Sequence, residues 1–346
     1  MTSSIDVPKR TQANSLDWPT AQQPLTHDES NSYHITSAFS DAAAHAHALS
    51  GWEQSYVQLS AGRFVGTLLE INLDHLRLVR ETTNKVIHER GHSRGRHRTI
   101  CVPVQMNGLA YFNGLPWTIN ACTSLLGETD FDLITPDSLD LISISADNDR
   151  LAYTLTPGSD PAGMAGSAII RISPRQLPAL TIVLNSIFKR IAMQPEILNL
   201  AAIRRDIEES VFEVLADALY PPVDTRVPRP IYSVRRRIVQ DAIEYVRSDP
   251  SGNVSVSDLC RLLHLNRRTL QEYFQDVVKF SPKQYLLAYR LGKVRSLIID
   301  SNGPISIKDA AMRWGFWHLG EFANLYKRLF QELPSCTVGS RQSLCE

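Results

Sequence analysis

The sequence lacks the features of three protein classes. No apolar run approaches the roughly 18 consecutive residues that a membrane-spanning helix needs. Residues 1–34 contain no apolar core and are polar with several prolines, so we predict a disordered tail and no secretory signal. The five cysteines are odd in number and form no CxxC pair. This pattern argues against a disulfide framework and favours reduced thiols in a cytoplasmic protein.

Catalytic signatures are also missing. The chain has no Ser/His/Asp, phosphate-loop or CxxC motif. Four histidines of the N-terminal half fail to combine with an acidic residue at the spacing of a metal site: His75, His88, His92 and His97. The nearby Glu89 lies in the run HERGHSRGRHR (88–98), whose alternation with Gly and Ser is typical of a solvated hairpin loop. We therefore expect no enzyme activity and no metal ligands.

The net charge of zero conceals an asymmetry. Residues 231–346 contain 17 Lys and Arg against 11 Asp and Glu, whereas residues 1–230 contain 19 against 25. A basic C-terminal third behind an acidic remainder is by itself a weak signal for a polyanionic partner at the C-terminal end.

The N-terminal part reads as mainly β. After an Ala-rich stretch at 35–51 that we predict to be helical, short runs rich in β-branched and aromatic residues recur about every ten residues, from RFVGTLLEINL at 63 to AIIRIS at 168. Such spacing predicts an antiparallel barrel or sandwich. Helical periodicity follows at 176–192 and 196–219. We therefore assign 35–222 to one N-terminal domain and the proline-rich 223–234 to a linker.

Residues 235–346 contain an internal duplication. Asp258 in the segment 254–282 corresponds to Asp309 in the segment 305–334, at an offset of 51 residues. Three further positions match at an offset of 52: Leu270, Phe274 and Pro282 with Phe322, Tyr326 and Pro334. Each copy reads as a short helix, a tight turn and a longer helix, which is a helix-turn-helix. Both aspartates lie where they interact with the positive end of a helix dipole.

The second copy contains the unusual joint Trp-Gly-Phe-Trp. We predict that Gly315 takes the left-handed position after the first helix and that Phe316 turns inward. His318 is expected to cap the next helix, which gives Trp317 and Phe322 the spacing of a hydrophobic staple. The first copy repeats the arrangement, with Asn266 as the cap and Leu265 packed against Leu270. Such a joint presents the second helix rigidly, as reading of the DNA major groove requires.

These motifs resemble the paired helix-turn-helix domain of the AraC/XylS family of bacterial transcription regulators. The resemblance rests on NRRTL at 266–270, Ser281-Pro282, YRLGKVRSLI at 289–298, and IKDAA…WGF leading into F…YKRLF…P. It covers about a hundred residues. Three glycines typical of the family are replaced by His264, Lys279 and Gln331, and we expect left-handed turns there at a cost of about 1 kcal/mol each.

Helical phase and the resemblance together predict which residues contact DNA. Helical phase places polar side chains on the outer faces of 267–278 and 319–330. Carried over from the family, the base-reading positions are Arg268, Gln271, Glu272, Gly320, Glu321 and Asn324. The Arg, Gln, Glu and Asn side chains in this set are of types that hydrogen-bond base edges. We assign four cations to phosphates: Arg267, Lys283, Lys327 and Arg328. The competing interpretation is that each charge merely belongs to a solvated helix face.

The resemblance implies an α+β chain with a cupin-like β-barrel sensor, a double-stranded DNA operator, RNA polymerase as a partner and a small-molecule effector. A narrower resemblance to ethanolamine-utilisation regulators implies ethanolamine or a cobalamin as the effector. Glu70, Tyr111 and Trp117 are candidate effector contacts, although aromatic residues are more often core. Helix 196–219 is a candidate homodimer surface through Leu200, Ile207, Val211 and Val214; packing on its own barrel is the alternative.

Two other functions remain open at this point. One is a regulator controlled by a protein partner instead of a small molecule. The other is a metal-dependent cupin-type enzyme fused to a DNA-binding domain, which the missing histidine and carboxylate cluster disfavours.

Overall fold

The computed structural model describes residues 33–95, 97–149, 151, 168–172, 176–219, 232–249, 252–300 and 305–342. The tail predicted for 1–34 and the linker predicted for 223–234 lie almost entirely outside these ranges. Helix α5 (Tyr232–Ser248) begins three residues before the expected start of the DNA-binding domain at 235.

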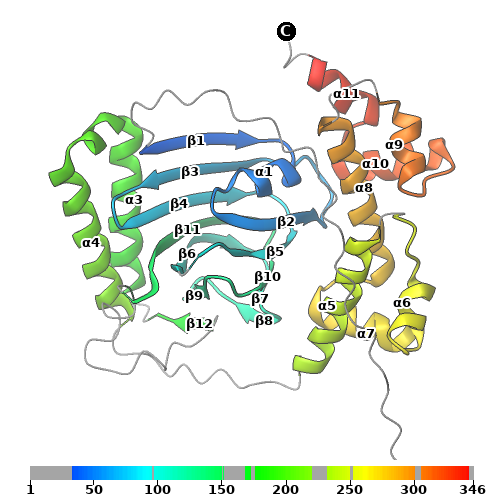
Figure 1. Ribbon diagram of the computed structural model, residues 1–346, viewed down its shortest axis with the longest axis horizontal. Coiled ribbons are helices and arrows are strands. Elements are labelled where there is room, and N and C mark those ends of the chain that lie inside the picture. Colours follow the sequence, from blue (N-terminus) through cyan, green and yellow to red (C-terminus); the bar gives the residue numbers. More distant parts are fainter. Residues whose placement is uncertain are drawn as a thin grey trace, which may run out of the picture. The chain divides into compact units, whose positions relative to one another are not determined.

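Two antiparallel sheets form the N-terminal part (Figure 1). The seven-stranded sheet has the order β1 (His34–Phe39), β3 (Gly66–Asn72), β4 (Leu76–Thr83), β11 (Ser138–Asp147), β6 (His97–Asn107), β9 (Ala121–Leu126) and β12 (Ala168–Arg171). The five-stranded sheet has the order β2 (Trp52–Gln58), β5 (Ile87–Ser93), β10 (Phe131–Ile134), β7 (Ala110–Phe112) and β8 (Leu115–Trp117). The fold is thus a cupin-like pair of open sheets and not a closed barrel.

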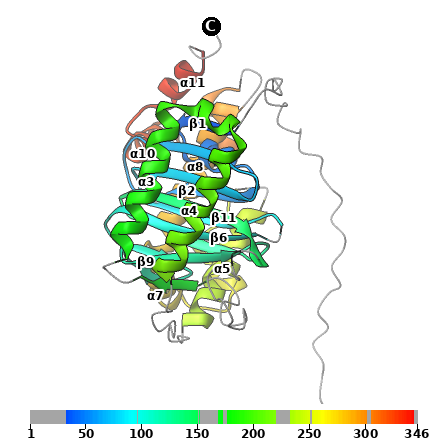
Figure 2. The same ribbon diagram turned by 90° about the vertical axis from the view of Figure 1, so that its left-hand side faces the viewer.

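Both faces of the larger sheet are buried. Helices α3 (Leu177–Met193) and α4 (Ala201–Leu219) cover one face (Figure 2). In β11, Leu139 and Leu141 belong to the core between the sheets, whereas Ile142 and Ile144 belong to the core under the helices. The two sets lie on opposite faces because side chains alternate along a strand. The register shift opposite Asp140 and Leu141 adds the extra residue Val104 to β6 and leaves this alternation in β11 intact. Burial on both sides explains why apolar residues occur on both faces of β11.

Three predicted elements were wrong. Within 35–51 only α1 (Ala42–Ala48) is helical, because the preceding residues pair with β3 as a strand. The run 88–98 is not a loop: its first half forms β5, held between β2 and β10. The helix predicted at 196–219 is interrupted, with a 3-10 turn at Pro195–Asn199, an extended Leu200, and then α4.

The C-terminal part is entirely helical where it is described. After α5 come six further helices: α6 (Val256–Leu262), α7 (Arg267–Val277), α8 (Pro282–Asp300), α9 (Ile307–Arg313), α10 (Leu319–Phe330) and α11 (Pro334–Gln342). One apolar core joins α5, α6, α7 and the first half of α8, and a second joins the other half of α8 to α9, α10 and α11. The predicted duplication is therefore present as two helix-turn-helix units that share α8.

Candidate nucleic-acid interface

The first unit, α6 and α7, has the turn chemistry that its sequence predicts. Ser255 and Asp258 form a reciprocal capping box at the start of α6, so the predicted helix-end role of Asp258 is confirmed. His264 has a φ of 53° in the turn. Asn266 caps α7 by accepting a hydrogen bond from the Thr269 amide at 2.8 Å.

The second unit, α9 and α10, confirms two of the four features predicted for the joint, the left-handed Gly315 and the inward Phe316. Gly315 has a φ of 78° directly after α9, and the buried Phe316 packs against Phe322 with 5.2 Å between ring centroids. His318 precedes α10 but makes no capping bond through its side chain. The predicted staple is wrong, because Trp317 is 64% exposed. Phe316 already occupies the inward position against Phe322, so Trp317 points to solvent.

The outward face of α7 carries the predicted reading residues. The predicted base-reading and phosphate residues of this unit are all exposed: Arg267, Arg268, Gln271, Glu272 and Lys283. The Arg268 side chain is 89% exposed, and its Nε donates to Glu272 Oε1 at 3.0 Å. An exposed pair of this kind contributes little to stability, so both groups are free to exchange this contact for base edges.

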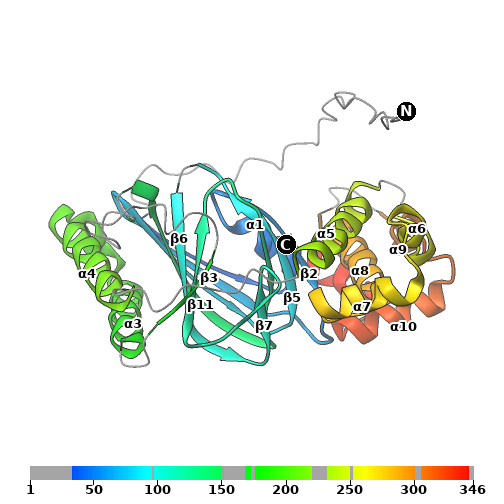
Figure 3. The ribbon, with the colours of Figure 1, turned by 90° about the horizontal axis from the view of Figure 1, so that it is seen from below.

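The outward face of α10 has the same character. Its predicted DNA contacts are exposed as well: Gly320, Glu321, Asn324, Lys327 and Arg328. A Cβ added at Gly320 would meet no atom within 4 Å, which leaves an open approach at the start of the helix. Leu319, which helical phase places inward, is 41% exposed. Helices α7 and α10 lie on the same side of α8 (Figure 3).

Helix α8 fixes the spacing between the two units. Its first half contributes Leu286 and Tyr289 to the core of the first unit. Its second half contributes Leu291, Val294 and Ile298 to the core of the second. Because protein cores are closely packed, one continuous helix buried in both units restrains α7 and α10 relative to each other.

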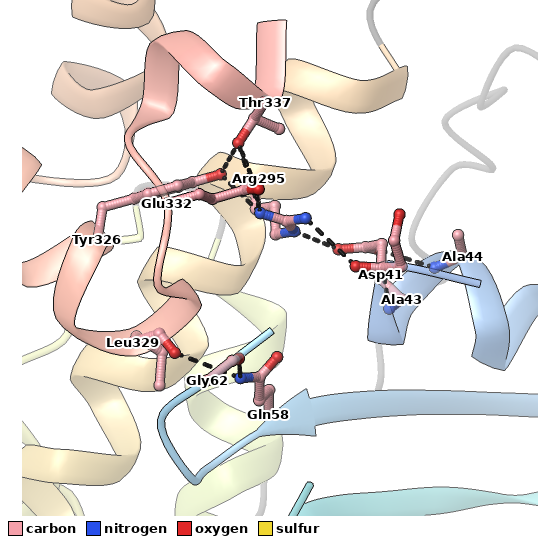
Figure 4. Close-up of polar contacts among 11 residues, drawn as sticks. Asp41, Ala43, Ala44, Gln58, Gly62, Arg295, Tyr326, Leu329, Glu332 and Thr337 are labelled. Carbon is pink, nitrogen blue, oxygen red and sulfur yellow. Dashed lines mark hydrogen bonds and ion pairs between the residues drawn. The ribbon is translucent and has the colours of Figure 1, made fainter. Parts of the chain in front are cut away.

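Polar contacts tie the second unit to the N-terminal sheets. Arg295 of α8 is only 8% exposed. Its Nε donates to Asp41 Oδ2 at 2.9 Å, and its Nη1 pairs with Glu332 and donates to the Tyr326 hydroxyl at 3.2 Å (Figure 4). Asp41 also caps α1. Sequence reasoning missed this network.

Two further contacts reach the helices, one from the segment between β2 and β3 and one from β5. The Gly62 amide donates to the Leu329 carbonyl near the end of α10 at 2.8 Å (Figure 4). His88 lies 3.1 Å from the Tyr285 hydroxyl through Nδ1 and 3.0 Å from Asp132 through Nε2. Burial alone would raise the pKa of Asp132, but His88 and two nearby arginines outweigh burial and lower it.

The candidate effector residues lie in three separate places. Glu70 is buried, and its carboxylate already accepts hydrogen bonds from Arg77 at 2.7 Å and Ser50 at 3.2 Å. Tyr111 packs against the core of the first helical unit, with Lys279 Nζ 4.2 Å from its ring centroid. Trp117 is buried between the sheets. The structure does not bring the three together around one cavity.

Most of the apolar residues proposed for the dimer surface are buried or half-buried in the core of the N-terminal part. Val211 of α4 is fully buried under the seven-stranded sheet, and Ile207 and Val214 are half-buried against the same cluster. Leu200, outside α4, is 59% exposed. Packing of α4 on its own sheet, the alternative to a dimer surface, accounts for Ile207, Val211 and Val214.

The described residues lack two further features. No group of three or more His, Cys, Asp or Glu side chains that could hold a metal ion occurs among them. Within the same residues, no helix combines the length and apolarity needed to cross a membrane.

The helices described above match a known protein family. Residues 259–339 match a family model described as a helix-turn-helix domain. The chain is 28% identical over 133 residues to the XylDLEGF operon transcriptional activator of Pseudomonas putida. This match covers 38% of the chain and 41% of that protein. It is 32% identical over 100 residues to a probable thc operon regulatory protein of Rhodococcus erythropolis. That match covers 28% of this chain and 30% of the relative.

Two solved structures show weaker likeness. The AraC-like transcriptional activator CuxR aligns over 66% of this chain and 80% of its own, at 14% identity and a TM-score of 0.36. ToxT of Vibrio cholerae aligns over 84% of this chain and 98% of its own, at 16% identity and a TM-score of 0.27. The family match and the curated relatives support the resemblance to AraC/XylS-type regulators. The chain spans less than half the length of those curated relatives, and the narrower ethanolamine-regulator resemblance stays a prediction.

Proposed function

We propose that this chain is an effector-responsive transcription activator that reads two adjacent major-groove segments of one operator through α7 and α10. The observation that carries the proposal is the pair of exposed helices on one side of a shared α8, each with polar side chains suited to base edges. The curated relatives are regulators of operons, which supports the same function.

The two sheets ahead of these helices suit the sensing role. The seven-stranded sheet has its own apolar core with α3 and α4, whereas Leu59 and Ile134 beside the smaller sheet belong to the core of the first helical unit. The Arg295, Gly62 and His88 interactions described above add polar contacts to the helices. If the chain has two arrangements of these contacts that differ in DNA affinity, a ligand that prefers one arrangement shifts the population toward it. The shift is limited by the difference between the ligand's binding free energies for the two arrangements. RNA polymerase and a second copy of the chain are proposed partners in the same scheme.

Base reading by α7 is tested by Arg268→Ala. We expect a loss of about 1–3 kcal/mol in binding free energy on a selected operator and relaxed preference at one base position. Fluorescence anisotropy with the selected site and with random duplexes measures both quantities. The matched control is Lys327→Ala, which should weaken binding to every sequence about equally and reduce the salt dependence. Equal losses on selected and random DNA for Arg268→Ala would reduce this residue to a phosphate contact.

A further inference from the structure

The turn into α10 exposes two large apolar side chains. Trp317 and Leu319 are both exposed, within an uninterrupted exposed stretch at residues 317–321. Trp317 has no inward position to fill, because Phe316 already packs against Phe322. Tryptophan side chains are mostly buried in folded proteins, and removing apolar surface from water is favourable. The pair therefore gains free energy from any apolar partner that reaches this end of α10.

The first helix-turn-helix unit has different chemistry at the corresponding positions. Helix α7 begins with Arg267 and Arg268, whereas α10 begins with Leu319 and Gly320. The residue before the cap of α7 is the half-buried Leu265, which packs on the core of its own unit. In the second unit the exposed tryptophan has that place. The start of α10 therefore presents apolar surface where the start of α7 presents two positive charges.

The exposed apolar pair is continuous with the proposed DNA-contacting face of α10. Gly320 and Glu321, which are predicted base contacts, directly follow Leu319 in the same exposed stretch. A Cβ added at Gly320 would meet no atom within 4 Å, so a base edge can approach the helix closely. Recognition helices contact base edges through their N-terminal residues. In the major groove, the apolar group that base edges present is the C5 methyl of thymine.

We propose that Trp317 and Leu319 recognise thymine C5 methyl groups in the operator segment that α10 reads. The inference rests on the proposed function, because it names the base feature that one of the two recognition helices selects. The two units then differ in kind: α7 selects bases through the hydrogen bonds of Arg268 and its polar neighbours, and α10 adds selection by apolar contact. Burial of one methyl group corresponds to about a fourfold gain in affinity.

Deoxyuridine tests the contact, because it lacks the methyl group of thymine and keeps its base pairing. Operators are selected from random duplexes with the full chain, and the segment under α10 is the one where Asn324→Ala relaxes base preference. Thymines are then replaced by deoxyuridine in one segment at a time, and fluorescence anisotropy measures the affinity. Selection should enrich thymine under α10, and each contacted thymine replaced there should cost about fourfold in affinity. Replacement under α7 should leave the affinity nearly unchanged.

Variants of the chain connect the methyl effect to the two side chains. In Trp317→Ala and in Leu319→Ala, the loss caused by deoxyuridine should shrink, because part of the methyl contact is already missing. Trp317→Phe should keep much of the loss. Leu262→Ala, which replaces an exposed leucine of α6, is the matched control and should show the full loss. All three positions are exposed, so none of these replacements opens a cavity in the core.

Three results would overturn the inference: equal affinity for the thymine and deoxyuridine operators, an undiminished deoxyuridine effect in both alanine variants, or a selected operator without thymine under α10. Reduced transcription activation by the alanine variants, with operator affinity and the deoxyuridine effect unchanged, would assign the pair to a protein partner and would also overturn it. Each of these results leaves operator binding intact and contradicts this inference alone. Failure of the unchanged chain to select any operator would contradict the proposed function, and this inference with it.

Discussion

Three residues with side chains occupy left-handed backbone positions in the helical part. His264, Lys279 and Gln331 have φ values of 53°, 67° and 58°, each after a helix or within a turn between helices. A Cβ makes this conformation unfavourable by about 1–2 kcal/mol relative to glycine. These are the positions at which the sequence departs from the glycines typical of the family it resembles. The left-handed turns expected there are confirmed.

His264→Gly should therefore stabilise the chain by about 1 kcal/mol, because glycine takes the same backbone without steric cost. The free energy of unfolding from urea titration measures the gain. His264→Ala is the control and should give none. Lys279→Gly should gain less, since it removes the contact between the lysine and the Tyr111 ring. A destabilised His264→Gly variant would show that the imidazole makes a contact worth more than the strain.

The residues that bind DNA in our proposal were easier to predict than those that connect the two parts. Helical phase is sufficient to place Arg268 and Asn324 on outer faces. The same phase places Arg295 on the buried stripe of α8, beside Val294 and near Ile298, and a buried arginine needs acidic partners. Its partner Asp41 lies 254 residues away, a separation that sequence spacing cannot bridge.

At the scale of elements, strand β5 shows why local patterns mislead. Its glycine and charged residues are typical of a loop, but the strand is paired on both sides, and His88 and Glu89 are 1% and 4% exposed. The elements that were predicted well, such as β4 and β11, alternate apolar and polar residues as a half-buried strand does. The elements that were not, β1 and β5, owe their conformation to the neighbouring strands that satisfy their backbone groups.

Strand β5 also makes stability depend on pH. Burial, reinforced by the charge of Glu81, raises the pKa of Glu89 well above its usual value of 4.5. The folded chain therefore holds a proton that the unfolded chain has lost, and stability falls as pH rises from the unfolded pKa to the folded one. Glu89→Gln should raise the melting temperature at pH 8, with a smaller gain at pH 5.

Differential scanning fluorimetry at the two pH values measures this difference. Glu209→Gln is the control, because Glu209 is exposed on α4 and its replacement should change neither melting temperature. An equal gain for Glu89→Gln at both pH values would mean that Glu89 is ionised in the folded chain and that its pKa is not raised by burial.

At the scale of the whole molecule, one buried charge lies at the centre of the polar contacts between the N-terminal part and the second helix-turn-helix unit. Arg295 joins Asp41 of the N-terminal part to Glu332 and Tyr326 of the second helix-turn-helix unit. Asp41 divides its oxygens, since Oδ1 caps α1 and Oδ2 accepts from Arg295. The two roles can therefore be separated by substitution.

Asp41→Asn keeps the cap but removes the charge that faces Arg295. We expect the free energy of unfolding to fall by about 1–3 kcal/mol, because a buried guanidinium loses a charged acceptor. Hydrogen exchange should quicken in α1 and at the end of α10. Asp309→Asn, an exposed helix-start substitution that faces no arginine of the N-terminal part, should cost less. Unchanged stability and exchange in Asp41→Asn would contradict a structural role for this link.

The central claim is that α7 and α10, held by one α8, read two segments of the same duplex. The most direct measurement is the affinity of the full chain for a selected operator and for the same operator with about five base pairs inserted between its two segments, roughly half a helical turn. We predict a loss on the order of a hundredfold, because one helix then faces the wrong side of the duplex and its base contacts, at about 1–3 kcal/mol each, are lost. Equal affinity for both duplexes would contradict the claim.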